Sequence, residues 1–248
     1  MSLASFDFSP SMTLSYFAER PNRFIITCIL ASKGTEIEAH LPDSGRLTEL
    51  LKPGAEIYLL PNNNPERKTA YSAVCVKRPD GKGWVSLNST VPNRLSGLAL
   101  KNNLLPSFEK WNYVRSEYTK GRSRWDHLLE TDSGEKMVVE VKGVTLTDNN
   151  QTGYFPDAVT ARGTKHVLEL IDINEEKGWH AALLFVAQRS DIKELKPADW
   201  IDPAFSQAMR KAGSAGVLTA ACRCDVSPQG MRLTDEIPVI LDKSADKF

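Results

Sequence analysis

Three charged residues, Asp126, Glu140 and Lys142, have types and a spacing suited to cleaving a phosphodiester. Glu140 and Lys142 are two residues apart in the valine-rich run Val138–Val144, so in a strand their side chains project from one face. Asp126 lies on the preceding strand-like run, and residues 132–134 would turn the two runs into a hairpin. Two converging carboxylates suit Mg²⁺ or Mn²⁺. Asp126 and Glu140 are therefore the predicted metal ligands.

The predicted catalytic residues are these two carboxylates and Lys142. A metal ion here would polarise the phosphodiester and activate a water, while Lys142 would orient the water or offset developing charge. An ion pair between Glu140 and Lys142 on the solvent-facing side of an amphipathic strand explains the same spacing. The spacing alone leaves both interpretations open.

Basic residues are concentrated around Asp126. Residues 94–124 contain seven Lys or Arg and two Asp or Glu, whereas the whole chain has 31 Lys and Arg and 31 Asp and Glu. Lys and Arg clusters bind phosphates, and interleaved aromatic rings can stack on unpaired bases. A solvated charged surface over an aromatic core explains this composition too, and composition alone favours it. The aromatic residues are Trp111, Tyr113, Tyr118 and Trp125. The predicted DNA-contacting residues are Arg46, Arg94, Arg115, Lys120, Arg122, Arg124, Arg162, Lys165 and His166.

Three of these predictions depend on local geometry. Gly45 and Arg46 begin a predicted helical turn whose free N–H groups would suit a phosphate, although a plain strand-to-helix turn with Arg46 in an ion pair fits equally. Arg162 and His166 are four residues apart and share a helix face that could meet phosphate. A single histidine on a helix is more often structural.

The first ninety residues are predicted to be β structure. Runs 24–30 and 35–41 flank a turn at 31–34, and runs 69–78 and 83–88 flank a turn at 79–82. With run 55–60, these five short strands suggest a small barrel, of which the OB fold is one example.

A compact α/β unit is predicted for the remainder. A helix over 94–102, capped by Asn93, precedes strands over 111–118, 123–131 and 137–146. A helix over 159–177 closed by Gly178, a strand over 181–187 buried on both faces, and a helix over 203–212 follow. Runs 217–224 and 237–241 are the last predicted strands.

Composition excludes several classes of protein. The longest apolar run has seven residues, far short of a membrane span, and no secretory signal precedes the first strand. Four cysteines in 248 residues do not form a disulfide framework, and we expect buried reduced thiols. We therefore expect a soluble cytoplasmic protein.

Seven motifs in order along the chain resemble the sugar fermentation stimulation protein A (SfsA) family. They are Arg20–Phe24, Leu41–Arg46, Pro92–Leu95, Ser123–Asp126, Glu140–Leu146, Gly153–Thr160 and Arg162–His166. The resemblance implies an N-terminal OB fold over residues 1–90 and a C-terminal α/β domain over 91–248 similar to PD-(D/E)xK nucleases. It assigns the nuclease positions to Asp126, Glu140 and Lys142.

The chain departs from the family pattern at three positions. Leu98 and Ala161 stand where relatives commonly have Glu, and His127 replaces an apolar residue after Asp126. The family resemblance implies non-specific DNA binding and a regulatory role in sugar (maltose) metabolism. The alternatives are an active metal-dependent DNA endonuclease, a binding module without catalysis, and an RNA- or nucleotide-binding protein.

Overall fold

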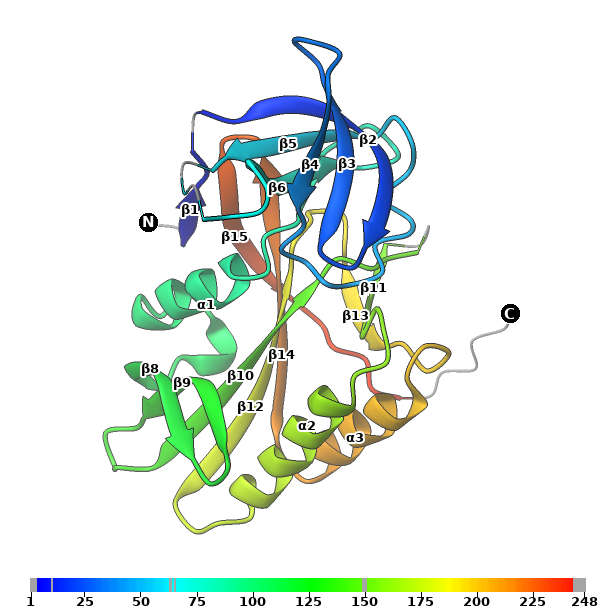
Figure 1. Ribbon diagram of the computed structural model, residues 1–248. Helices are drawn as coiled ribbons and strands as arrows, with labels where there is room; N and C mark the ends of the chain where they lie inside the picture. Colours follow the sequence, from blue (N-terminus) through cyan, green and yellow to red (C-terminus); the bar gives the residue numbers. More distant parts are fainter. Residues whose placement is uncertain (1–3, 10, 63, 65, 149–150, 243–248) are drawn as a thin grey trace.

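The structure, a computed structural model, describes residues 4–9, 11–62, 64, 66–148 and 151–242 (Figure 1). Its N-terminal part is a six-stranded sheet in the order β4-β3-β2-β5-β6-β7, and an additional β4–β6 pairing closes it into an OB-fold barrel. Ile26, Cys28, Ile57 and Leu59 fill the interior and are fully buried. The strands are β2 (Thr13–Asn22), β3 (Ile25–Leu30), β4 (Glu36–His40), β5 (Glu56–Pro61), β6 (Tyr71–Lys77) and β7 (Trp84–Ser86).

Local turn signals predicted most of this barrel correctly. Gly34 has a φ of 64° in the β3–β4 turn, and Gly81 a φ of 73° in the β6–β7 turn, a conformation that glycine adopts without steric cost. The sequence analysis missed β2, whose polar residues obscure its alternation. The predicted helical turn at 46–51 is present as a single turn, in which the N–H groups of Leu50 and Leu51 donate to Leu47 O.

The C-terminal part is a seven-stranded sheet in the order β1-β15-β14-β12-β10-β9-β8. Strands β10, β12 and β14 are parallel, and their neighbours at both edges are antiparallel. The strands of this sheet are β1 (Ser5–Asp7), β8 (Asn112–Lys120), β9 (Ser123–Glu130), β10 (Lys136–Val144), β12 (Trp179–Ala187), β14 (Leu218–Ser227) and β15 (Gly230–Ile237).

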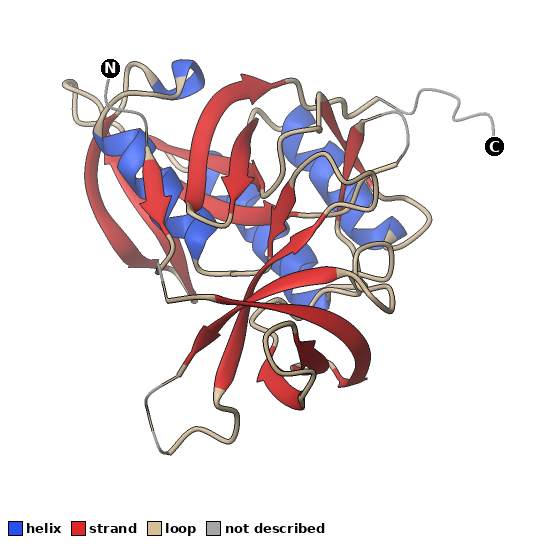
Figure 2. Cartoon of the chain, turned by 90° about the horizontal axis from the view of Figure 1, so that it is seen from above, coloured by secondary structure: helices blue, strands red, loops and turns tan. Residues whose placement is uncertain are grey.

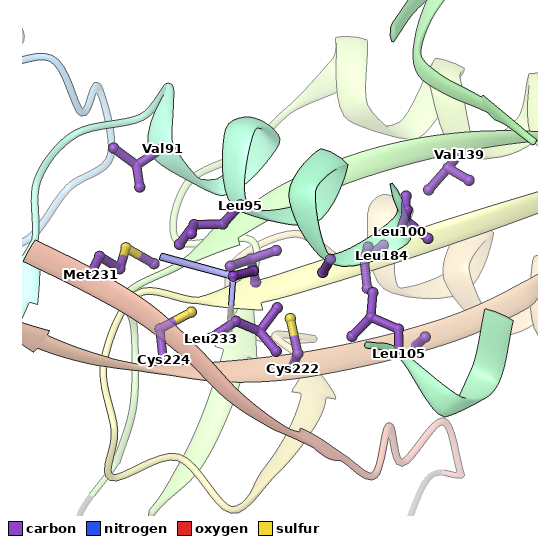
Figure 3. Close-up of a cluster of buried hydrophobic side chains, with 14 of the residues drawn as sticks. Val91, Leu95, Leu100, Leu105, Val139, Leu184, Cys222, Cys224, Met231 and Leu233 are labelled. Carbon is purple, nitrogen blue, oxygen red and sulfur yellow. The ribbon is translucent and has the colours of Figure 1, made fainter. Parts of the chain in front are cut away.

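Helices cover both faces of this sheet (Figures 1 and 2). Along β12, Ala182 and Leu184 pack with α1 (Val91–Lys101), while Leu183 and Phe185 pack with α2 (Ala161–Asn174) and α3 (Pro203–Ser214). This alternation confirms that the 181–187 run is buried on both faces. Figure 3 shows the α1 side, where Leu95 lies over Leu233 and the buried free thiols Cys222 and Cys224.

Three helix or strand boundaries differ from prediction. Helix α1 begins at Val91 after Thr90, so Asn93 lies inside the first turn and does not cap it. Helix α2 ends at Asn174, whose side chain donates to Ala215 O and accepts from Ala181 N, because the chain already turns there towards β12. The predicted strand at 237–241 is mostly wrong, since the last strand is β15.

The remaining elements are short. Strand β1 pairs with β15 and so lies in the C-terminal sheet, although the barrel was predicted to begin at residue 1. The 3-10 turn η1 (Pro106–Phe108) and the two-stranded sheet of β11 (Thr152–Phe155) and β13 (Glu194–Pro197) complete the fold. Among the described helices, none is long and apolar enough to cross a membrane.

Candidate active site and nucleic-acid interface

The fork between β9 and β10 brings Asp126 and Glu140 together. The ladder pairs Lys136 with Glu130 and ends with Val139 opposite His127, so the next positions in register are Asp126 and Glu140. Asp126 Oδ2 accepts a hydrogen bond from the N–H of Val141 at 2.7 Å. The carboxylate thus bonds to the backbone of β10 just beyond the last residue that pairs with β9.

Asn93 fixes the other oxygen of Asp126. Its Nδ2 donates to Asp126 Oδ1 from the first turn of α1. The sequence analysis assigned Asn93 to helix capping and missed this contact. The Pro92–Leu95 motif contains this residue. Because α1 begins at Val91, Asn93 lies in the first helical turn, from which its side chain reaches Asp126 on β9.

Glu140 is buried and its Oε1 receives two basic groups. Lys142 Nζ lies 2.5 Å from this oxygen and His166 Nδ1 lies 2.8 Å from it. His166 projects from α2, where Thr160 Oγ1 accepts from Gly163 N at the N-cap, and packs edge-on against Trp125. The structure therefore places His166, predicted to contact phosphate, in the same cluster as Glu140 and Lys142.

The two carboxylates of the fork have opposite pKa shifts. Burial and the charge of Glu140 together raise the pKa of Asp126 to about 6, against the opposing effects of the Val141 N–H and Lys142. Burial also pushes the pKa of Glu140 upward, but His166 and Lys142 outweigh it, so that this pKa is lowered. A nearby cation would favour the ionised form of Asp126.

The donor set at the fork fits an open Mg²⁺ site. Mg²⁺ is commonly held by one or two protein carboxylates, with waters and substrate phosphates completing its shell. Within the described ranges, no group of three or more His, Cys, Asp or Glu side chains is arranged to hold a metal ion. The residues thus suit a metal ion shared with a phosphate better than a closed structural site.

The predicted basic surface is only partly available. Arg94, Arg115, Arg122 and Arg162 are exposed and form no ion pair with any described residue. Three other cations of the predicted surface are engaged in ion pairs. Arg124 pairs with Glu117 at 2.7 Å, Lys165 with Glu169 at 3.4 Å, and Lys120 with Glu176 at 2.7 Å.

The two tryptophans of the basic segment are core residues. Trp125 is fully buried and Trp111 is 2% exposed, where its ring packs against His180. The core interpretation of these two rings is confirmed, and neither can stack on a base. Tyr113 and Tyr118 remain half-buried on β8.

The Gly45–Arg46 turn does not offer free N–H groups. Gly45 N donates to Asp43 Oδ1 at 2.8 Å, and Arg46 N donates to Asp157 Oδ2 at 3.1 Å across the two domains. The phosphate cradle predicted at this turn is therefore wrong. Burial raises the pKa of Asp43 to about 6, and burial also raises the pKa of Asp157.

The three departures from the family pattern lie in different surroundings. Leu98 and Ala161 are exposed. His127 is buried under α1, with Nε2 2.9 Å from Ser96 Oγ, and burial lowers its pKa to about 4. His127 is thus held on the α1 side, away from the cluster at Glu140.

Comparisons with known proteins cover both parts of the chain. The family model described as "Sugar fermentation stimulation protein RE domain" matches residues 90–230, and the "SfsA N-terminal OB domain" matches residues 18–87. A sugar fermentation stimulation protein homolog of Shouchella clausii is 41% identical over 232 residues, which is 94% of this chain and 99% of that one. A homolog of Clostridium tetani is 42% identical over 225 residues, covering 91% and 95%.

The solved structure of Pyrococcus furiosus SfsA in complex with Ca²⁺ is 25% identical and superposes with a TM-score of 0.83, covering 97% of this chain and 99% of that one. The order of elements, the fork at Asp126 and Glu140, and both domain matches lead to one conclusion. The chain belongs to the sugar fermentation stimulation protein (SfsA) family.

Proposed function

We propose that this protein binds DNA without sequence preference and cleaves its phosphodiesters with a divalent metal ion at the fork between β9 and β10. The observation that carries the proposal is the register that aligns Asp126 with Glu140, with Lys142 Nζ 2.5 Å from the Glu140 carboxylate. The Ca²⁺ complex of the Pyrococcus furiosus relative supports a divalent cation, because Ca²⁺ and Mg²⁺ both prefer oxygen ligands.

Bound Mg²⁺ or Mn²⁺ would supply Lewis-acid polarisation of the phosphodiester and make an attacking water more acidic. Asp126 and Glu140 would hold the ion. Asn93 and the Val141 N–H fix the orientation of Asp126, and His166 fixes that of Glu140. Lys142, 18% exposed, can turn its ammonium from Glu140 to a phosphate oxygen and offset charge that develops there.

The exposed arginines supply the affinity for DNA. Arg94, Arg115, Arg122 and Arg162 need not release an ion-pair partner among the described residues before binding phosphate. Such contacts neutralise phosphate and carry no base information. This makes the proposed binding of duplex DNA dependent on salt and indifferent to sequence.

The second candidate is a DNA-binding regulator of sugar metabolism without cleavage, in keeping with the family's name. Two observations favour it. Leu98 and Ala161 stand where relatives commonly have Glu, so two carboxylates are absent. Glu140 Oε1 already contacts both Lys142 and His166. In this candidate, Glu140, Lys142 and His166 form a structural charge cluster. RNA or nucleotide binding is a further alternative because OB folds accept many ligands.

Nicking of supercoiled plasmid DNA with Mn²⁺ separates the two candidates. Cleavage by the wild type and its loss in Asp126→Asn and Glu140→Gln would support the nuclease. The matched control is Asp172→Asn, which changes an exposed carboxylate of α2 and should cleave like the wild type.

Retained DNA binding with no nicking at any Mn²⁺ concentration would reject the nuclease in favour of the regulator. Equal nicking by the wild type and both fork variants would place the activity elsewhere. Competition between equal lengths of DNA and RNA tests the preferred nucleic acid.

A further inference from the structure

A cavity of about 310 Å³ lies at the junction of the barrel and the nuclease-like domain. Asp43 and Ser89 line it from one side, and Gly143, Phe155, Asp157 and Gln188 from the other. Gly143 directly follows Lys142, so the cavity begins one residue beyond the proposed catalytic lysine. Its volume is at the lower end of the range for sites that bind small molecules.

Gln188, which lines this cavity, has a buried side-chain acceptor without a partner among the described residues. Its side chain is 1% exposed, and among the described residues nothing donates to its Oε1. Its backbone is fixed, because its N–H donates to Val144 O and its carbonyl accepts from Ser86 N. A buried amide oxygen without a partner costs free energy, so a ligand that donates to it gains affinity.

Gly143 has no side chain, and this leaves room for the side chain of Gln188. A Cβ at Gly143 would lie 3.2 Å from Gln188 Nε2 and 3.2 Å from Pro92 Cγ, closer than ordinary van der Waals contact. The glycine that follows Lys142 therefore keeps the amide at the wall of the cavity.

Two carboxylates add further acceptors. Asp157 Oδ2 and Asp43 Oδ1 both lie within 3.0 Å of the point where a Cβ on Gly45 would stand. Each of these oxygens accepts one backbone N–H, which leaves the second oxygen of each carboxylate for another donor. Arg23 at the cavity is exposed and forms no ion pair with the described residues.

We propose that this cavity binds one unpaired nucleobase that carries an exocyclic amino group, next to the scissile phosphate; the proposal rests on the function proposed above. The amino N–H groups of cytosine, adenine or guanine match the acceptors of Gln188, Asp43 and Asp157, whereas thymine and uracil have no amino group. Phe155 supplies an apolar wall, and Arg23 is available to the phosphate of the same nucleotide.

The test compares labelled ten-residue oligonucleotides of deoxycytidine and deoxyuridine. Cytosine has an amino group at C4 and an unprotonated N3, whereas uracil has a carbonyl oxygen at C4 and an N–H at N3. Binding is measured by fluorescence anisotropy in EDTA, so that cleavage does not interfere. The wild type should bind the deoxycytidine strand about tenfold more tightly, and Gln188→Leu should abolish this ratio while leaving duplex affinity unchanged. Gln207→Leu, an exposed glutamine of α3, is the matched control and should keep the ratio.

Equal affinity of the wild type for both strands, or an unchanged ratio in Gln188→Leu, would overturn the proposal. If Asp157→Asn removes stabilisation by Ca²⁺ without changing the ratio, the cavity is a cation site and the proposal is wrong. The ratio of affinities for the deoxycytidine and deoxyuridine strands is measured first on the wild type. Misfolding of Gln188→Leu therefore cannot conceal a negative result.

Failure of this proposal can be distinguished from failure of the proposed function. Duplex binding and plasmid nicking without a deoxycytidine preference would reject only the base site. Absence of binding to every duplex and single strand would reject the DNA-binding function, and the base site with it.

Discussion

Asp126 and Val141 are joined across the fork of β9 and β10 by a hydrogen bond of 2.7 Å, from the Val141 N–H to Asp126 Oδ2. Val141 directly follows Glu140, so this bond fixes the Asp126 carboxylate beside the second acid of the fork. Burial and the charge of Glu140 both oppose ionisation of Asp126. A divalent cation would relieve both effects, and metal binding should therefore stabilise the fold.

The first prediction is that Mn²⁺ stabilises the wild type and has no effect on Asp126→Ala. At a concentration one hundred times Kd, the gain in free energy of unfolding is about 2.7 kcal/mol. Thermal melting across a Mn²⁺ titration measures it, with Asp172→Asn as the control that should respond like the wild type. An identical response of the wild type and Asp126→Ala would disprove the metal site at the fork. DNA affinity of Asp126→Ala should stay close to that of the wild type.

The second prediction concerns pH and the carboxyl group of Asp43. Burial raises its pKa to about 6, above its value in the unfolded chain, so the folded state binds more protons between about pH 4 and pH 6. Stability should therefore fall as pH rises through this window, by at most about 3 kcal/mol. Asp43→Asn keeps an acceptor for Gly45 N and should remove the part of this decline that Asp43 causes, while Asp126, whose pKa is also raised to about 6, keeps its own part. Urea unfolding at a series of pH values measures it; parallel curves for wild type and variant would refute the assignment.

The third prediction tests the junction of the domains at Gly45. A methyl group there would stand 1.8 Å from Asp157 Oδ2, so Gly45→Ala must displace the carboxylate that accepts from Arg46 N. We expect a loss of about 2 kcal/mol in free energy of unfolding, from overpacking and a broken hydrogen bond between the two domains. Gly83→Ala is the matched control, because its methyl would meet no atom closer than 3.5 Å. Equal stability of the two variants would contradict the prediction.

The fourth prediction separates Arg122 from Arg124 on the proposed DNA surface. Arg122 forms no ion pair with the described residues, whereas Arg124 is bonded to Glu117. Arg122→Gln should lower the slope of log affinity against log salt by about 0.9 on duplex DNA, the value for one phosphate contact. Arg124→Gln should lower it less, and Lys33→Gln on the barrel should leave it unchanged. A slope unaffected by Arg122→Gln would move the DNA surface away from the β8–β9 hairpin.

Much of the fold could be predicted because its signals are local. The β3–β4 and β6–β7 turns follow from the turn chemistry of residues 31–34 and 79–82, and the two-sided burial of β12 follows from an unbroken apolar run. Strands with polar or short sequences, such as β2 and β1, were missed because their pairing partners stabilise them more than their own composition does.

The sequence by itself also determined the shared face of Glu140 and Lys142, because side chains of a strand repeat every two residues. Only the tertiary structure decided what surrounds them: His166 reaches Glu140 from a helix 26 residues away, and Arg46 meets Asp157 across 111 residues. Such contacts arise when separately folded surfaces pack, and side-chain periodicity within a strand or helix carries no information about which surfaces will meet. For this reason the cavity at Gln188 could not be read from the sequence, whereas the spacing of the fork residues could.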